Sequence, residues 1–247
     1  MDAIRISLPA IENIQVLVSA EQVLKENCAY SYVVHYEKDL ASELAQLCDK
    51  YGSDKGEVRP DGHPYPWPSH TYADFMSDRY GHCRGLVSKV FECGLGTNNP
   101  ALASSMGAAG RPGASLRVWR DYFPNARIFG CDIDKEILFE EDRIRTFHVD
   151  QTSKESIVEM WNAIRETDFD LMIDDGLHEF DAGVSLFENS IDRLSIYGNY
   201  IIEDVNGIDM LRYRDYFSDK AYRVSYVTLH RPGLPLNDNQ LVVIRKS

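Results

Sequence analysis

Five residues at the ends of two apolar, β-branched runs carry side chains suited to acid–base and metal chemistry. Asp174, Asp175 and His178 follow one run, and Glu203 and Asp204 follow the next. Neighbouring strands lie about 4.8 Å apart, so parallel strands would bring Asp175, Glu203 and Asp204 within reach of one small cation. No Lys or Arg lies between the acids in either run, so they would repel one another unless neutralised. Such an all-oxygen ligand set predicts Mg²⁺.

The chemistry predicted from this arrangement is the activation of a hydroxyl group. Mg²⁺ bound to Asp175, Glu203 and Asp204 would hold a substrate hydroxyl and lower its pKa. His178, three residues after Asp175, would then accept the proton as a general base. Structural alternatives stay open: Asp-Asp-Gly is a common turn, Glu-Asp after a strand can cap a helix, and most single histidines are core or surface residues.

A glycine loop after an earlier apolar run predicts a cofactor site. Gly94 and Gly96 permit a tight turn and the close approach of a ligand. The third glycine of the dinucleotide fingerprint is absent, because Asn99 stands in its place. Glu92 would repel a diphosphate but tolerates the cationic methionine part of S-adenosylmethionine. The loop therefore favours S-adenosylmethionine, with a simple turn as the alternative.

Two further strand ends extend the predicted cofactor pocket. Asp132 ends the second strand, where an acidic side chain can accept hydrogen bonds from both ribose hydroxyls. Asp150 and Gln151 close the third strand, where an adenine ring usually lies. The alternative for this pair is the N-cap region of the helix that follows.

The elements that must position these residues alternate between short β-branched runs and longer amphipathic runs. The expected strands cover residues 87–94, 126–134, 143–150, 169–176 and 198–205, and the expected helices cover 114–123, 153–166 and 182–195. This alternation is typical of βαβ units and predicts an α/β fold with a parallel sheet. Two terminal strands, 222–229 and 239–247, are joined by a loop with Pro and Gly and predict an antiparallel hairpin.

Composition argues against several other classes of protein. A length of 247 residues fits one α/β domain with an N-terminal elaboration, and a net charge of −13 argues against nucleic-acid binding. No segment approaches the ~20 apolar residues of a membrane span, and the N-terminus lacks a signal-peptide pattern. The cysteines are odd in number and form no C-x-x-C pair, which predicts reduced thiols in a cytoplasmic protein. They are Cys28, Cys48, Cys83, Cys93 and Cys131.

Six segments together resemble the metal-dependent sugar O-methyltransferases of antibiotic pathways, a family that includes mycinamicin macrolide-sugar and calicheamicin-pathway rhamnose enzymes. The segments are KYGSDKG at 50–56, HTY at 70–72, GASLRVWRDYFPNARIFGCDID at 113–134, DQTS at 150–153, IDDGLH at 173–178 and IIEDV at 201–205. The resemblance extends over residues 40–247. It implies a Rossmann-like class I fold, with a seven-stranded, mostly parallel sheet whose last strand is antiparallel.

The resemblance also implies cofactors and residue roles. Mg²⁺ would bind Asp175, Glu203 and Asp204, and His178 would be the base. Residues expected to line the S-adenosylmethionine pocket are Glu92, Gly94, Asp132 and Asp174 by motif, beside Gly96, Asp150 and Gln151 from the strand ends. Those expected to approach its methionine end are Tyr51, Ser53, Lys55 and Ser115.

Two departures from the family pattern concern the substrate side. Leu177 stands where the family has a small residue, and the loop of residues 97–112 is longer than in plain methyltransferases. A related branch, the cephalosporin hydroxylase group, shares the fold and the metal site, so architecture alone does not determine the reaction.

The sequence thus predicts a S-adenosylmethionine-dependent O-methyltransferase acting on a hydroxyl of a sugar or sugar-containing small molecule. The pathway would be capsule, glycan or natural-product biosynthesis, and the acceptor a sugar, a sugar nucleotide or a glycoside. The alternatives are a hydroxylase-like enzyme on the same scaffold and a non-catalytic S-adenosylmethionine-binding protein. A homo-oligomer without nucleic-acid or membrane partners is expected.

Two regions of the chain are expected to have different roles. Residues 1–85 form an N-terminal extension, and residues 86–247 form the methyltransferase domain. The extension contains an aromatic and proline-rich stretch, 63–70, which is either a lid over the acceptor or an exposed connector or oligomer contact. As a lid, it would let Tyr65, Trp67 and Tyr72 stack on a sugar face.

Overall fold

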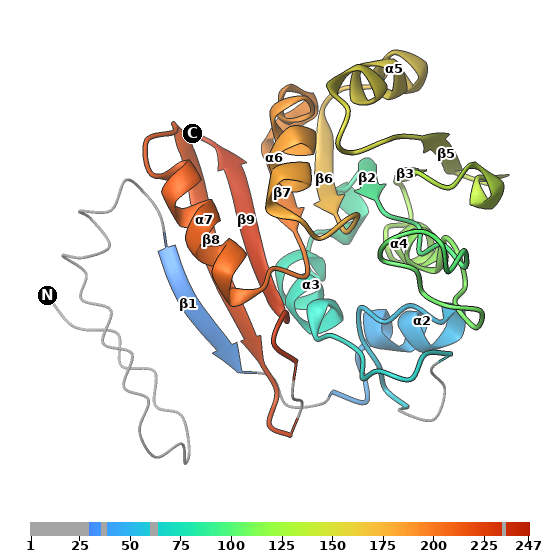
Figure 1. Ribbon diagram of the computed structural model, residues 1–247. Coiled ribbons are helices and arrows are strands. Elements are labelled where there is room, and N and C mark those ends of the chain that lie inside the picture. Colours follow the sequence, from blue (N-terminus) through green and yellow to red (C-terminus); the bar gives the residue numbers. More distant parts are fainter. Residues whose placement is uncertain (1–29, 36–38, 60–63, 234–235) are drawn as a thin grey trace, which may run out of the picture.

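The computed structural model describes residues 30–35, 39–59, 64–233 and 236–247. Within these ranges one sheet contains nine strands in the order β1-β8-β9-β7-β6-β2-β3-β5-β4 (Figure 1). Two residues of the sequence predictions, Cys28 and His63, lie outside the described residues. The strands are β1 (Tyr30–His35), β2 (Lys89–Cys93), β3 (Arg127–Asp132), β4 (Glu140–Glu141), β5 (Ile144–His148), β6 (Phe169–Asp174), β7 (Leu194–Ile202), β8 (Tyr222–His230) and β9 (Gln240–Lys246).

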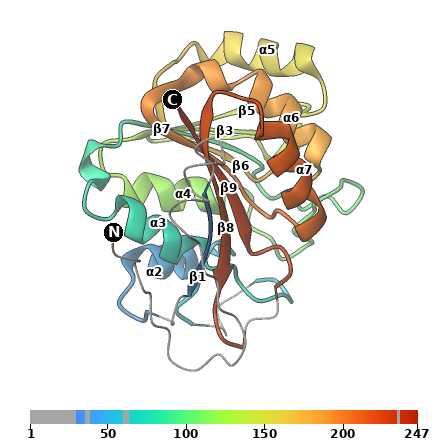
Figure 2. The same ribbon diagram turned by 90° about the vertical axis from the view of Figure 1, so that its left-hand side faces the viewer.

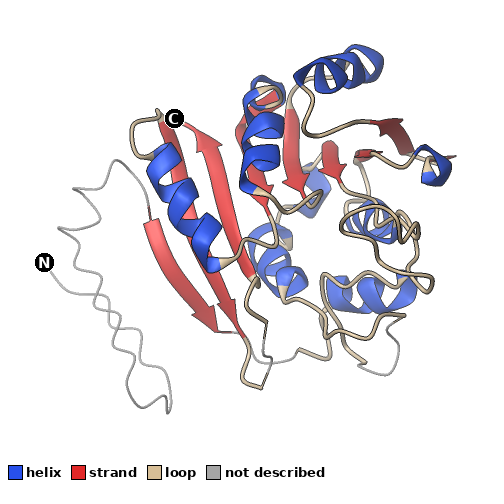
Figure 3. Cartoon of the chain, in the orientation of Figure 1, coloured by secondary structure: helices blue, strands red, loops and turns tan. Residues whose placement is uncertain are grey.

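Helices cover both faces of the sheet (Figures 2 and 3). They are α2 (Glu43–Tyr51), α3 (Tyr72–Tyr80), α4 (Ala114–Tyr122), α5 (Lys154–Ile164), α6 (Phe180–Glu188) and α7 (Gly207–Phe217). Successive residues of a strand point to opposite faces. Val90 of β2 accordingly packs in one apolar cluster with α2, α3 and α4, while Phe91 packs in a second cluster with α5, α6 and α7. The sheet is therefore buried on both sides, which explains its nearly continuous apolar runs.

The predicted α/β architecture and the terminal hairpin are confirmed. Strands β5, β3, β2, β6 and β7 are parallel neighbours, and β9 runs antiparallel to both β7 and β8. All seven expected strands are present, but the described sheet has nine. The two additions are β1, which pairs in parallel with β8, and the short β4, which pairs with β5. Both additions lie at the edges of the sheet: β1 pairs with a strand far along the chain, whereas β4 is a two-residue strand beside β5.

Strand order reverses between β2 and β6. From β2 the chain continues to β3 and β5 on one side, and then returns to β6 and β7 on the other. At such a point the loops that leave neighbouring strands diverge to opposite faces and open a crevice at the carboxyl ends. The carboxyl ends of β2, β6 and β7 are therefore where a ligand is expected.

Several helical boundaries differ from the sequence predictions. The helix expected over 182–195 is α6, which spans Phe180–Glu188, and β7 begins at Leu194 rather than at residue 198. Helices α2, α3 and α7 are not among the predicted helices. The side chain of Asn206 caps α7 by accepting hydrogen bonds from the backbone N–H groups of Ile208 and Asp209. Two apolar residues of α7, Ile208 and Leu211, are exposed, so this helix lacks a simple amphipathic pattern.

None of the helices in the described ranges has the length and apolar character to cross a membrane. The cysteines found in these ranges, Cys48, Cys83, Cys93 and Cys131, are free thiols, as predicted. Cys93 and Cys131 are buried in β2 and β3 and pair in register, where they pack as small apolar side chains.

Candidate active site

The register of the central strands places the predicted acids side by side. Asp174 is the register partner of both Cys93 and Ile202, so β2, β6 and β7 end at one level. The ladder continues one residue further, because Asp175 N donates to Cys93 O at 2.9 Å and Glu203 N donates to Asp174 O at 3.0 Å. Asp175 and Glu203 therefore start from adjacent backbone positions.

Two residues of the site adopt a backbone conformation that side chains other than glycine rarely take. His178 has φ 59° and Asp204 has φ 54°, both in the left-handed region. Such a conformation costs about 1–3 kcal/mol and persists only where the surroundings enforce it, typically at functional sites. Here it turns both side chains toward Asp175.

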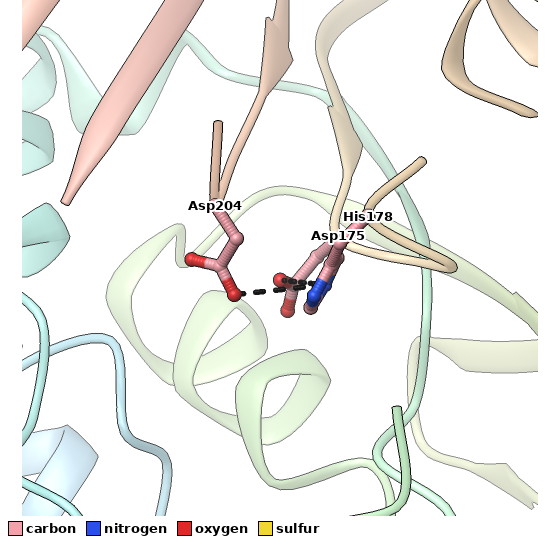
Figure 4. Close-up of side chains that lie close together, drawn as sticks. All are labelled: Asp175, His178 and Asp204. Atoms are coloured by element: carbon pink, nitrogen blue, oxygen red, sulfur yellow. Dashed lines mark ion pairs between the residues drawn. The ribbon is translucent and has the colours of Figure 1, made fainter. Parts of the chain in front are cut away.

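Asp175, His178 and Asp204 form a compact group (Figure 4). Their ligand atoms all lie within 4.8 Å of one another. His178 Nε2 is 3.4 Å from Asp175 Oδ1 and 3.5 Å from Asp204 Oδ2. Burial by itself lowers the pKa of His178, but its hydrogen bond to Asp175 and the charges of Asp204 and Asp175 raise that pKa to about 10. The imidazole is therefore protonated at neutral pH in this arrangement of carboxylates.

The expectation that no cation lies between the acids is wrong. Lys55 Nζ donates to Asp175 Oδ2 at 2.6 Å and to Glu203 Oε2, and it lies 3.7 Å from Glu92 Oε1. Burial lowers the pKa of Lys55, but the charges of these three acids raise it well above its ordinary value. The lysine side chain is only 2% exposed, so a charged ammonium group is enclosed among the carboxylates.

Glu203 retains one oxygen without a partner. Its Oε2 accepts from Lys55, but its Oε1 is buried and has no hydrogen bond. Burial raises the pKa of Glu203 well above its ordinary value, although the Lys55 charge lowers it. An unsatisfied buried carboxyl oxygen beside Asp175 and Asp204 fits a hard divalent cation, which takes oxygen ligands. The predicted ligands thus suit Mg²⁺, although Glu203 lies outside the compact group that Asp175 and Asp204 form with His178.

Tyr72 is a site residue whose role the sequence did not reveal. Its hydroxyl donates to Asp204 Oδ1 at 2.6 Å and accepts from Asp204 N at 3.0 Å. His70 stacks on the Tyr72 ring with centroids 4.6 Å apart, and its Nε2 lies 3.5 Å from Asp204 Oδ1. These contacts hold Asp204 from the side opposite His178. The HTY segment carried the family resemblance, which was the only sequence signal for this role.

Tyr72 does not stack on a sugar, because the residue is buried and only 1% exposed. Tyr65 and Trp67 stack on each other, with ring centroids 5.2 Å apart. The Trp67 indole N–H also donates to Asp54 Oδ2 at 3.2 Å. The described part of the aromatic stretch is thus tied to the segment that carries Lys55.

A cleft of about 340 Å³ lies beside Lys55 and Asp175. Five of the residues predicted to bind the cofactor line the cleft, and Tyr65 and Arg111 line it as well. The five are Ser53, Lys55, Gly94, Gly96 and Ser115. The hydroxyl of Tyr51 instead donates to Asp121 at 2.6 Å, away from the cleft.

Glu92 and Asp132 support the walls of this cleft from behind. Glu92 is fully buried and accepts hydrogen bonds from Ser115 Oγ at 2.5 Å and from the Trp119 indole N–H. Asp132 accepts from the backbone N–H of Leu95 at 2.8 Å, which fixes the glycine loop. A carboxylate oxygen has two lone pairs, so Asp132 retains capacity for a further donor such as a ribose hydroxyl.

Gln151 and Asp174 organise the loop that carries His178. Gln151 Nε2 donates to Asp174 Oδ1 at 2.6 Å, and its Oε1 accepts from Leu177 N at 3.0 Å. Burial raises the pKa of Asp174 to about 6, although the hydrogen bond from Gln151 lowers it. Asp150 accepts from the backbone N–H of Thr152 at 2.9 Å and lies three residues before Ser153, the N-cap residue of α5.

A second cleft, of about 290 Å³, opens on the other side of the acid group. His178, Glu203 and Asp204 line it together with Phe180 and Tyr213. Lys55 and Asp175 line the first cleft and Glu203 lines the second, so the contacts of Lys55 with these two acids lie between the clefts.

Comparison with known proteins identifies relatives for about two thirds of the chain. No protein-family model matches it. It is 32% identical over 162 residues to the 8-demethyl-8-alpha-L-rhamnosyl tetracenomycin-C 2'-O-methyltransferase of Streptomyces olivaceus, covering 66% of this chain and 37% of that protein. It is 37% identical over 93 residues to the mycinamicin VI 2''-O-methyltransferase of Micromonospora griseorubida, covering 38% of this chain and 23% of that protein.

A solved structure of a methyltransferase is similar to the same share of this chain. The MycE methyltransferase from the mycinamycin biosynthetic pathway, in complex with Mg, SAH and mycinamycin VI, matches with a TM-score of 0.51 and 27% identity. The match covers 66% of this chain and 37% of that one. The predicted Rossmann-like methyltransferase fold is therefore confirmed. The chain spans 37% of the length of both the first curated relative and this structure.

Gly94→Ala should disrupt the junction of the two loops. Gly94 has φ +96°, and a Cβ there would lie 1.9 Å from the carbonyl oxygen of Asp175. We expect a loss of stability well beyond the roughly 1–2 kcal/mol that a left-handed alanine costs. Gly107→Ala is the matched control, because Gly107 has φ +70° and open space around its Cβ position. Urea unfolding of both variants measures the difference, and equal midpoints would contradict the close approach.

Tyr72→Phe should destabilise the protein by about 1–3 kcal/mol, because it leaves the Asp204 carboxylate and backbone N–H without their buried partner. Tyr197→Phe is the control, since Tyr197 is 83% exposed and should change stability by less than about 0.5 kcal/mol. Urea unfolding at neutral pH tests both. A Tyr72→Phe variant as stable as the Tyr197→Phe variant would show that this hydroxyl does not hold Asp204.

Proposed function

We propose that this chain, which belongs among the homologues of the metal-dependent sugar O-methyltransferases, transfers the methyl group of S-adenosylmethionine to a sugar hydroxyl. One observation carries the proposal: a cleft lined by the predicted cofactor residues is separated from a second cleft only by the Lys55 contacts with Asp175 and Glu203. The named relatives are methyltransferases of glycosylated natural products, which supports methyl transfer over hydroxylation.

The cofactor would occupy the cleft lined by Ser53, Gly94 and Ser115. Gly94 permits the close approach of its loop to the Asp175 carbonyl beside this cleft, and Asp132 would accept hydrogen bonds from the ribose of the cofactor. Asp175 lies in the wall of the same cleft, and its negative charge favours the sulfonium end of the cofactor. The acceptor would enter through the second cleft, beside Phe180 and Tyr213.

Asp175, Glu203 and Asp204 would hold a divalent cation, Mg²⁺ in this proposal. When bound, the cation would lower the pKa of the acceptor hydroxyl and neutralise the carboxylates that raise the pKa of His178. His178 Nε2 would then accept the hydroxyl proton, while the oxygen attacks the methyl carbon and S-adenosylhomocysteine leaves. Tyr72 would keep Asp204 oriented throughout.

Calorimetric titration tests the cofactor assignment. We expect S-adenosylmethionine and S-adenosylhomocysteine to bind the purified protein, in either Mg²⁺ or EDTA. Tight binding of either compound justifies a screen of sugars and glycosides for metal-dependent methyl transfer. Absence of binding under both conditions would remove the methyltransferase proposal.

His178→Ala tests the role of the base. It should retain the affinity for S-adenosylmethionine but lower kcat by about 10²–10⁴-fold, the usual contribution of a general base. His82→Ala is the control, because His82 is exposed and lies outside both clefts. A His178→Ala variant with the kcat of His82→Ala would assign the proton transfer to another group.

A further inference from the structure

We propose that Lys55 is an internal counter-ion that positions Asp175 and Glu203 for a divalent cation and, at the same time, weakens the binding of that cation. The inference rests on the cation site of the proposed function. Lys55 was expected at the methionine end of the cofactor, and it does line that cleft, but its ammonium group contacts Asp175 of the same cleft and Glu203 of the other.

Lys55 uses one oxygen of each carboxylate and leaves the other available. Its ammonium contacts Asp175 Oδ2 and Glu203 Oε2. Asp175 Oδ1 instead faces His178 at 3.4 Å, and Glu203 Oε1 is buried without a hydrogen-bond partner. A carboxyl group held through one oxygen has its plane fixed, so the second oxygen is already aimed. Positioning of this kind reduces the reorganisation that cation binding would otherwise require.

The backbone that carries Lys55 is itself fixed to α3. Lys55 O accepts from Ala73 N at 2.7 Å, and the neighbouring Asp54 O accepts from His70 N at 2.7 Å. A Cβ at Gly56 would lie 2.4 Å from the Ala73 Cβ, so the two segments are in close contact. The backbone of Lys55 is therefore part of the packed structure, and its side chain is buried with the ammonium group beside the acids.

The charge of Lys55 has two opposite consequences. It stabilises the cation-free protein, because Glu92, Asp175 and Glu203 would otherwise be buried beside one another without a counter-charge. It also repels any cation that binds the remaining oxygens, and in a buried site such repulsion is weakly screened. Removal of the charge should therefore lower the stability of the cation-free protein and raise its affinity for divalent cations.

Lys55→Met and Lys55→Gln test this inference, with Lys55→Arg as the variant that retains the charge. Mn²⁺ titration followed by electron paramagnetic resonance at mildly alkaline pH gives the affinity without any assay of turnover. We expect about tenfold or tighter Mn²⁺ binding in the two neutral variants than in the wild type or Lys55→Arg. Their cation-free melting temperatures should be lower, and the increase on adding Mn²⁺ should be larger.

If Lys55→Met does not fold without a cation, Lys55→Gln and the double variant Lys55→Gln/Glu203→Gln keep the test open. The double variant removes one charge of each sign and should recover cation-free stability lost in the single one. Equal or weaker Mn²⁺ binding in a folded neutral variant would overturn the inference. Absence of Mn²⁺ binding in the wild type and in every variant would overturn both this inference and the proposed cation site. Failure to bind S-adenosylmethionine, with Mn²⁺ binding retained, would affect only the methyltransferase proposal.

Discussion

A carboxyl group taken out of water is stable only if another group compensates its charge, and the carboxyl ends of β2, β6 and β7 gather three of them. Glu92 and Glu203 have side chains with 0% exposure, and Asp175 lies between them with 22%. The ammonium group of Lys55 contacts Asp175 and Glu203 and lies 3.7 Å from Glu92. The packing of the N-terminal helices and the backbone conformation of the site residues both hold these charged groups in place.

The segment before the α/β domain supplies the compensating groups. Helix α2 leads into the loop of Lys55, and α3 begins with Tyr72, whose hydroxyl binds Asp204. Both helices pack in the same apolar cluster as α4 and one face of the sheet. The described part of the N-terminal extension is therefore integrated into the core. Its packing determines where the lysine and tyrosine reach the acids.

Backbone conformation contributes as much to the site as side-chain chemistry. His178 and Asp204 have left-handed φ values, and Gly94 brings its loop against the Asp175 carbonyl. These positions are costly or restrictive in isolation, and the hydrogen bonds of Gln151 and Tyr72 help to enforce them. The result is a group of acids and an imidazole whose directions are set before any ligand arrives.

By itself the sequence determined the alternation of strands and helices, and with it the residues that end each strand. Because parallel strands end at one edge of a sheet, that was enough to group Asp175, Glu203 and Asp204. It did not reveal that Lys55 and Tyr72 join them, at separations of 120 and 132 residues from their partners Asp175 and Asp204. Periodicity along the chain reports local structure and which face is buried, whereas contacts at such separations depend on how α2 and α3 dock against the sheet. Only the tertiary structure, which sums the packing of all these elements, decided that a lysine would neutralise the acids and a tyrosine would orient one of them.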